Sequence, residues 1–150
     1  MKEKKDKVRC IFCDAAADPK ADEQNLVIFR GTHAFVLLNL YPYTSGHLMI
    51  APYSHVSRLA EASEEDTAEI MHLTRRAERI LEQAYRPDGL NLGMNLGEAA
   101  GAGIEQHIHM HVLPRWKGDA NFMTSVGSTR IIPEALEDTY AKLREGFARL

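Results

Sequence analysis

The chain has 150 residues, with 18 Lys and Arg against 21 Asp and Glu, so its formal net charge is −3. This balance argues against non-specific binding to nucleic acid or to an anionic membrane, which usually depends on a large basic excess. A hydrophobic fraction of 45% suits a packed core and is too high for a disordered chain. No apolar run approaches the roughly 20 residues that cross a bilayer, and no signal-peptide core follows the charged N-terminus. We therefore expect one cytoplasmic domain over 1–150, with a flexible charged arm at 1–9.

The first half of the chain predicts a meander of three strands. Residues 14–24 are rich in Ala and Asp, which predicts a loop. Three apolar runs, rich in Val, Ile, Leu and Phe, predict strands at 26–30, 34–40 and 47–51. Gly31-Thr32 indicates a hairpin between the first two strands, and Pro52 ends the third.

The second half predicts two helices and two further strands. Apolar residues recur at helical spacing over 64–85, behind a capping box that runs from Ser63 to Asp66. Strands are expected at 90–95 and 107–113, separated by a loop rich in Gly and Ala. Pro133 fits the first turn of a closing helix, whose single apolar stripe comprises Leu136, Tyr140, Leu143, Phe147 and Leu150. The predicted fold class is α+β, with about five antiparallel strands, one long helix and one C-terminal helix.

The strongest local signal is the alternation of His107, His109 and His111 with apolar residues. Side chains alternate faces along a strand, so all three imidazoles are expected on one face. A neutral imidazole can attack phosphorus and form a covalent intermediate. A neighbouring histidine can stabilise phosphate charge or protonate the leaving oxygen. The glycine-bearing loop 97–103, just upstream, offers backbone N–H groups to phosphates.

The two cysteines, Cys10 and Cys13, have CxxC spacing, which in a reducing cytosol indicates metal or redox chemistry. The sequence has no second pair, so histidine or carboxylate would have to complete a metal site. In an alternative reading, the three alternating histidines hold a catalytic zinc that activates water. Their separation of about 6.5 to 7 Å along a strand makes that chelate awkward.

Three runs, GHLMIAPYSHV (46–56), GMNLGEAAGAG (93–103) and QHIHMHVLPRW (106–116), resemble the histidine triad (HIT) superfamily of nucleotide hydrolases and transferases. The resemblance extends from Cys10 to about Asn121. The segments AFVLLNLYPYTSGHLM and HVLPRWKGDANF are most similar to the bacterial diadenosine tetraphosphate phosphorylase branch. The resemblance implies a HIT-like fold, an adenine nucleotide as substrate and a homodimer.

The resemblance also implies catalytic roles for individual histidines. His109 matches the nucleophile that attacks the α-phosphate and becomes nucleotidylated. His111 matches the residue that contacts the phosphate and assists the leaving group, and His47 matches a histidine packed beneath the site. The substrate-binding candidates are Asn39 for the ribose hydroxyls, Asn95 and Gln106 for the phosphates, and Leu37 and Ile28 for the base, although these last two also suit the core.

Zinc-binding members of the superfamily imply a structural Zn²⁺ held by Cys10, Cys13, His55 and His107. Two thiolates and two imidazoles make a closed tetrahedral site. Such an ion would tie the N-terminal arm to the triad strand without attacking the substrate. His33 and His72 are expected at the surface.

The expected activity is cleavage of a dinucleoside polyphosphate, such as diadenosine tetraphosphate, at the α-phosphate through nucleotidyl-His109. His111 favours this hydrolase-like pattern over the uridylyltransferase branch, which carries Gln there. Many HIT proteins have Ser or Thr shortly before the triad, where this chain has Gly103 and Ile104. The sequence therefore leaves open which length of phosphate chain is preferred. It also leaves open whether phosphate or water is the acceptor. The alternatives are a nucleoside phosphoramidate hydrolase and a non-catalytic nucleotide-binding module. Trp116 either packs at a domain or dimer surface or walls a second nucleotide pocket.

Overall fold

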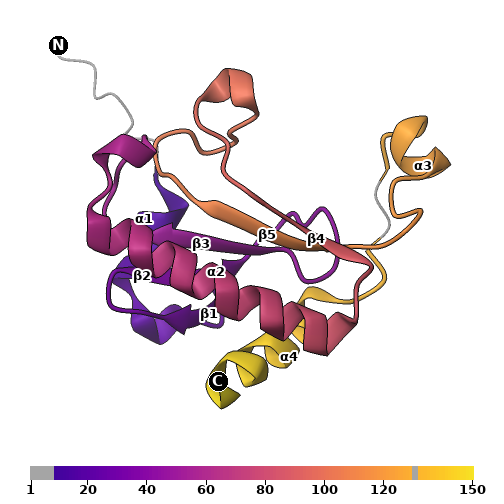
Figure 1. Ribbon diagram of the computed structural model, residues 1–150, viewed down its shortest axis with the longest axis horizontal. Helices are drawn as coiled ribbons and strands as arrows, with labels where there is room; N and C mark the ends of the chain where they lie inside the picture. Colours follow the sequence, from indigo (N-terminus) through magenta and orange to yellow (C-terminus); the bar gives the residue numbers. More distant parts are fainter. Residues whose placement is uncertain (1–8, 130–131) are drawn as a thin grey trace, which may run out of the picture.

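The computed structural model describes residues 9–129 and 132–150. Apart from Arg9, the arm expected at 1–9 lies outside the described residues. The described chain forms one antiparallel sheet with the strand order β1-β2-β3-β5-β4 (Figure 1). Its strands are β1 Val27–Arg30, β2 Ala34–Leu38, β3 Leu48–Pro52, β4 Gly89–Gly93 and β5 Met110–Arg115. The predicted α+β class and five-stranded sheet are confirmed.

In the described residues, four helices and three 3₁₀ turns accompany the sheet: α1 Ile11–Ala17, η1 Pro19–Ala21, η2 Leu59–Glu61, α2 Glu64–Tyr85, η3 Glu98–Ala100, α3 Phe122–Ser125 and α4 Leu136–Arg149. The long helix begins as predicted, because the Ser63 hydroxyl accepts the backbone N–H of Asp66 at 3.0 Å. It ends at Tyr85, and its C-cap residue Arg86 adopts the left-handed conformation with φ 47°. Within the described ranges, no helix combines the length and the apolar character needed to span a membrane.

The main core lies between the sheet and the pair α2 and α4, which lie side by side in Figure 1. Alternate residues of each inner strand face this core, as the pleat of a strand requires. They are Ala34, Val36 and Leu38 of β2, Leu48 and Ile50 of β3, and Val112 of β5. Ile28, a candidate for the base pocket, belongs to this core and is 5% exposed. It therefore lies on the opposite face of the sheet from Leu37.

A second, smaller core lies on the other face of the sheet, beneath α1. Phe12 and Ala15 of this helix pack against residues of opposite alternation in the first three strands: Val27, Phe35, Leu37, Met49 and Ala51. The loop predicted at 14–24 is therefore wrong over the part that α1 and η1 occupy. Phe12 and Ala15 are three residues apart on one side of the helix, and burying that side stabilises a segment whose composition resembles a loop.

The largest remaining differences from the predicted boundaries are at the last strand and the closing helix. The last strand begins at Met110, because the backbone N–H of Ile108 donates to Val56 O instead of joining the sheet. The closing helix begins at Leu136, with Ala135 as its N-cap, so Pro133 precedes the helix and does not occupy its first turn. Of the predicted stripe, Leu150 is 59% exposed and lies outside the core.

Candidate active site and metal centre

The second and third triad histidines lie together at the edge of the smaller core. His109 is 5% exposed, and its ring centroid lies 4.7 Å from that of His111, edge to face. The rings are closer than the separation expected along a strand, because His109 precedes β5 and only His111 lies within it. Phe12, from α1, packs against the His109 ring at 4.8 Å. The expected shared placement of these two imidazoles is therefore found, on a backbone that is only partly strand.

A hydrogen-bond relay fixes the proton on His111. The backbone N–H of Tyr43 donates to His47 Nδ1 at 3.1 Å. A neutral His47 then carries its proton on Nε2, which lies 2.8 Å from His111 Nδ1. Because His111 Nδ1 accepts the hydrogen bond from His47 Nε2–H, a neutral His111 keeps its own proton on Nε2. His47 is completely buried, and the relay makes His111 a hydrogen-bond donor through Nε2.

His109 is held in the opposite tautomer from His111. Its Nδ1 lies 2.9 Å from the carbonyl oxygen of His107, and a carbonyl only accepts, so Nδ1 carries the proton. A neutral His109 therefore has its lone pair on Nε2, the form that an attacking imidazole needs. Burial lowers the pKa of His109. Burial, with the neighbouring His109, lowers the pKa of His111 to about 4. Both imidazoles are thus neutral at pH 7.

A cavity of about 650 Å³ opens onto this pair. Its volume lies within the range of small-molecule sites, roughly 300 to 1,000 Å³. Polar groups come from His109, His111 and Asn39, and Gly101 and Gly103 contribute backbone from the glycine-bearing loop. Much of the remaining wall is apolar, with Ile11 and Ala15 of α1, Leu37 and Leu38 of β2, and Met49 of β3. The structure therefore brings together the predicted nucleophile, its neighbour, the ribose candidate and the base-pocket candidate Leu37.

Two predicted phosphate contacts lie elsewhere. Gln106 lines a separate surface hollow with Arg58, Leu59 and Leu96. The Asn95 amide donates to Gly101 O at 3.5 Å, so it contacts the glycine-bearing loop. Asn39 lines the cavity, although its Oδ1 accepts the backbone N–H of Tyr41 at 2.9 Å. The amide of Asn39 is thereby oriented by its own turn.

Two residues of the site were missed by sequence reasoning. Phe12 packs on both His107 and His109, with ring centroids at 5.1 and 4.8 Å. Tyr43 supplies the N–H that begins the relay, and its ring lies 4.7 Å from that of His47. An aromatic residue inside the CxxC pair and another four residues before His47 were the available signals, but each also suits an ordinary core or turn.

The remaining triad member, His107, belongs to a cluster with both cysteines. His107 Nε2 lies 2.8 Å from Pro52 O, so that nitrogen carries the proton and Nδ1 is free to ligate. Nδ1 lies 3.4 and 3.6 Å from the sulfurs of Cys10 and Cys13 and 3.2 Å from His55 Nδ1. Cys13 Sγ and His55 Nδ1 are also 3.2 Å apart. All four ligand atoms lie within 4.8 Å of one another.

These spacings fit one tetrahedral ion. With Zn–S near 2.3 Å and Zn–N near 2.0 to 2.1 Å, tetrahedral ligands are about 3.3 to 3.8 Å apart. Burial and the neighbouring Cys10 raise the pKa of the Cys13 thiol to about 11, so a bound cation would have to displace its proton. Two sulfurs and two ring nitrogens are the donor set that zinc prefers. The residues present therefore fit the structural zinc that the sequence predicts.

The alternative catalytic zinc finds no support in the geometry of the triad. His107 faces the cysteines, the Nδ1 of His109 is occupied by a carbonyl, and the Nδ1 of His111 by His47. The other two histidines lie where they were expected. The His33 side chain is 44% exposed, 3.8 Å from a carboxylate oxygen of Asp66, and His72 is exposed on α2.

Comparison with known proteins identifies the family. A model described as HIT domain matches residues 20–118, so the chain belongs to the HIT domain family. An AP-4-A phosphorylase of Mycobacterium tuberculosis is 46% identical over 129 residues, which cover 86% of this chain and 66% of that protein. The chain thus spans just under two thirds of the length of that relative.

Solved structures agree with this assignment. A Zn-bound histidine triad family protein from Mycobacterium smegmatis is 26% identical and superposes with a TM-score of 0.72, covering 93% of this chain and 94% of that one. A hypothetical histidine triad nucleotide-binding protein from Sulfolobus tokodaii, also 26% identical, gives a TM-score of 0.74 and covers 94% and 93%. The expected HIT-like fold is therefore confirmed.

Proposed function

We propose that this protein is an enzyme that cleaves a dinucleoside polyphosphate, such as diadenosine tetraphosphate, at an α-phosphate through a covalent nucleotidyl-His109. The observation that carries the proposal is the opposite protonation of two adjacent imidazoles. His109 offers a lone pair on Nε2, and His111 offers a proton on Nε2, beside a cavity of nucleotide size. A nucleophile next to a proton donor is what displacement at phosphorus requires.

In the first step, the Nε2 lone pair of His109 attacks the α-phosphorus, and the bond from that phosphorus to its bridging oxygen breaks. ATP leaves, while AMP stays attached to His109. The His111 Nε2–H donates to the phosphate oxygens and to the departing oxygen as negative charge develops there. The carbonyl of His107 accepts the Nδ1–H of His109 at 2.9 Å, which stabilises the positive charge that the substituted ring acquires.

In the second step, an acceptor attacks the same phosphorus and the bond to His109 Nε2 breaks, which returns the imidazole. Inorganic phosphate as acceptor gives ADP, and water gives AMP. The M. tuberculosis relative is named a phosphorylase, which favours phosphate. His47 does not contact the substrate in this mechanism. Its hydrogen bond keeps His111 in the tautomer that donates through Nε2 during both steps.

The nucleoside half of the proposal rests on the cavity lining. Leu37 contributes to an apolar wall suited to a base, and Asn39 borders the same cavity, where its amide can meet ribose hydroxyls. The glycine-bearing loop contributes Gly101 and Gly103, whose backbone can approach phosphates closely. Asn95 would act through that loop. A phosphate role for Gln106 would need it to leave its separate hollow.

We further propose that Cys10, Cys13, His55 and His107 hold a structural Zn²⁺. Bound there, the ion would cross-link the start of α1 to the segment before β5. The homodimer and the cytoplasmic location stay predictions, as does the absence of nucleic-acid and membrane partners.

The test is to incubate the purified protein with diadenosine tetraphosphate, with and without inorganic phosphate, and to identify the products by mass spectrometry. We expect ATP and ADP, with cleavage dependent on phosphate. Cleavage to ATP and AMP without phosphate would identify a hydrolase. If neither diadenosine tetraphosphate nor an adenosine phosphoramidate is cleaved, the catalytic role of His109 toward adenine nucleotides is wrong, and a non-catalytic nucleotide-binding module becomes the better description.

A further inference from the structure

The short helix α1 forms part of the wall of the nucleotide cavity. Ile11 and Ala15 line the cavity directly. The next cavity-lining residues in the chain, Gln24, Asn25 and Leu26, form a segment that we call the 24–26 lip. A helix of seven residues has little stability of its own. The position of this wall therefore depends on what holds α1 and the lip to the rest of the protein.

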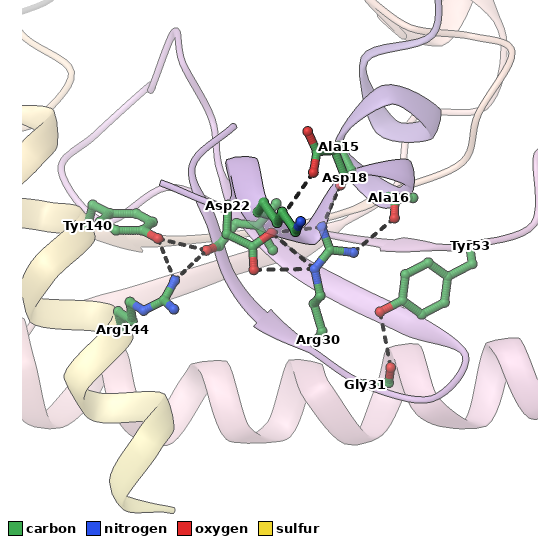
Figure 2. A network of polar contacts seen from close by, with 11 residues as sticks. Ala15, Ala16, Asp18, Asp22, Arg30, Gly31, Tyr53, Tyr140 and Arg144 are labelled. Carbon is green, nitrogen blue, oxygen red and sulfur yellow. Dashed lines mark hydrogen bonds and ion pairs between the residues drawn. The ribbon is translucent and has the colours of Figure 1, made fainter. Parts of the chain in front are cut away.

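Arg30, at the end of β1, holds the C-terminal end of α1. Its guanidinium donates to Ala15 O at 2.5 Å and to Ala16 O at 3.1 Å (Figure 2). These carbonyls lie in the last turn of the helix, where backbone acceptors lack partners within the helix. The last turn of α1 contains no basic residue of its own. Arg30 thus supplies, from a neighbouring strand, the cation that favours a helix C-terminus.

The same guanidinium holds the start of the lip. It donates to both carboxylate oxygens of Asp22, with contacts at 2.7, 3.0 and 3.3 Å. The pair is largely buried, with about a fifth of each side chain exposed. This paired geometry raises the pKa of Arg30 further above its ordinary value. A planar fork that reaches two carbonyls and one carboxylate at once is a geometry that lysine cannot reproduce.

The far end of the lip is held from the C-terminal helix. Val27 O accepts from the Tyr140 hydroxyl at 3.0 Å and from Arg144 at 3.3 Å (Figure 2). Between these two clamps, Leu26 adopts a φ of +58°, which is uncommon for a residue with a branched side chain. Such a conformation persists where surrounding contacts determine it. The lip is thus a restrained segment, with its polar clamps at Asp22 and Val27.

The N-terminal end of α1 carries the proposed metal ligands Cys10 and Cys13. Besides the packing of Phe12 and Ala15 in the smaller core, the helix therefore has two polar anchors at its two ends, the cysteine cluster and Arg30. We propose that Arg30, paired with Asp22, is a positioning residue that fixes the α1 and lip wall of the nucleotide cavity and still holds one end of that wall when the metal is lost. Arg30 does this without lining the cavity. The inference rests on the proposed function for the identity of the ligand as a nucleotide.

Two anchors on one short helix predict a specific pattern of coupling. Either anchor alone still holds one end of α1, so removing one has a moderate effect, whereas removing both leaves the wall held only by the packing of Phe12 and Ala15. The variants are Arg30→Met, Cys13→Ser and the double variant, with Arg30→Lys as the conservative change and Asp22→Asn as a milder one. Arg76→Met is the matched control, because Arg76 also bonds a helix-end carbonyl, Phe147 O at 2.9 Å, but on the opposite face of the sheet.

The readouts are the affinity for AMP by calorimetry and the hydrogen exchange of residues 11–17 and 24–26. Each single variant should bind AMP about tenfold more weakly, and the double variant should lose far more than the product of the two. Arg30→Lys should bind AMP about as weakly as Arg30→Met, because lysine keeps the charge but lacks the planar fork of the guanidinium. Exchange should rise in α1 and the lip, while the strands β2 and β3 keep their protection. Arg76→Met should lower thermal stability and leave AMP affinity unchanged.

Multiplicative effects of the two single changes, or full recovery by Arg30→Lys, would overturn the proposal. So would unchanged exchange of 11–17 in Arg30→Met. If the wild-type protein neither binds AMP nor cleaves diadenosine tetraphosphate, the proposed function fails. The exchange of α1 then decides by itself whether Arg30 anchors the helix.

Discussion

His47 Nε2 lies 2.8 Å from His111 Nδ1, and the backbone N–H of Tyr43 occupies the other nitrogen of His47. A buried residue that does not itself line the cavity can thus set the tautomer of one that does. The tautomer of His109 is fixed separately, by its hydrogen bond to the carbonyl of His107. The groups around the two imidazoles therefore place a proton on His111 Nε2 and a lone pair on His109 Nε2 before any substrate binds.

Replacing His47 with Phe should lower kcat by about 10²-fold, because His111 would lose the partner that fixes its proton on Nε2. KM should change little, since His47 is completely buried and His111 and Asn39 remain in place. Steady-state kinetics with diadenosine tetraphosphate measure both constants. His72→Gln, on the exposed side of α2, is the control and should behave as the wild type. An equal fall in kcat for both variants would contradict the relay.

Cys13→Ser should remove the metal. We expect one zinc per chain in the wild type and close to none in the variant, because serine is a poor zinc ligand at pH 7. The melting temperature should fall in the same variant, since a structural ion stabilises the fold that binds it. Elemental analysis and calorimetry measure the two effects. Equal zinc content in both proteins would exclude this cluster as the site.

Acidification from pH 7 to pH 5 should destabilise the protein through His111. Its pKa in the folded protein is about 4, below the ordinary value near 6.5 for the unfolded chain. Above pH 6.5 both states are neutral and the group has no effect. Between pH 6.5 and 4, His111 binds a proton in the unfolded chain but stays neutral in the folded protein, so the free energy of unfolding falls.

Urea unfolding at pH 7 and pH 5, in the presence of a chelator, measures this effect. His111→Gln should lose about 1 kcal/mol less than the wild type over this interval, after allowance for solvent screening. The comparison uses the change with pH in each protein, so a constant stability difference between them does not matter. The same pH dependence in both would exclude His111 as a source.

Gly46→Ala should destabilise the fold by about 1 to 3 kcal/mol. Gly46 has a φ of +84°, and a Cβ there would lie 2.9 Å from a ring carbon of Tyr85. Because Gly46 directly precedes His47, the variant should also lose activity. Gly89→Ala is the control, since a Cβ at Gly89 meets no heavy atom within 4 Å. Thermal unfolding of the two variants should therefore differ clearly, and equal melting temperatures would contradict the steric argument.

The elements with strong periodicity could be predicted from the sequence. The long helix has the bounds that its cap and apolar spacing predicted, 64–85. The five strands also follow from apolar runs separated by turns. Helix α1 could not be predicted in this way, because its stability comes from Phe12 packed beneath the sheet and from Arg30, which is distant in sequence. Alternation of the histidines suggested one continuous strand, whereas His107 and Ile108 bond to Pro52 O and Val56 O outside the sheet, so the strand begins only at Met110.

Some site residues could likewise be placed from the sequence, whereas others depended on how the chain folds. The cysteine and histidine cluster assembles the four predicted ligands, because their chemistry and the resemblance pointed to the same set. Leu37 faces the cavity and Ile28 faces the core, because Val27 pairs with Leu37 on one face of the sheet and Ile28, the next residue of β1, faces the other way. Gln106 lies outside the cavity because the chain turns before His107. Neither effect is visible in local composition.

The most direct test of the central claim is to trap the reaction intermediate. Wild-type protein is mixed with diadenosine tetraphosphate, quenched within milliseconds and examined by intact mass and peptide mapping, alongside His109→Gln. The proposed mechanism predicts one adenylyl group per chain on His109, and in the variant no adduct and a turnover reduced on the order of 10³-fold or more. Turnover by His109→Gln near the wild-type rate, with no adduct on the wild type, would contradict it.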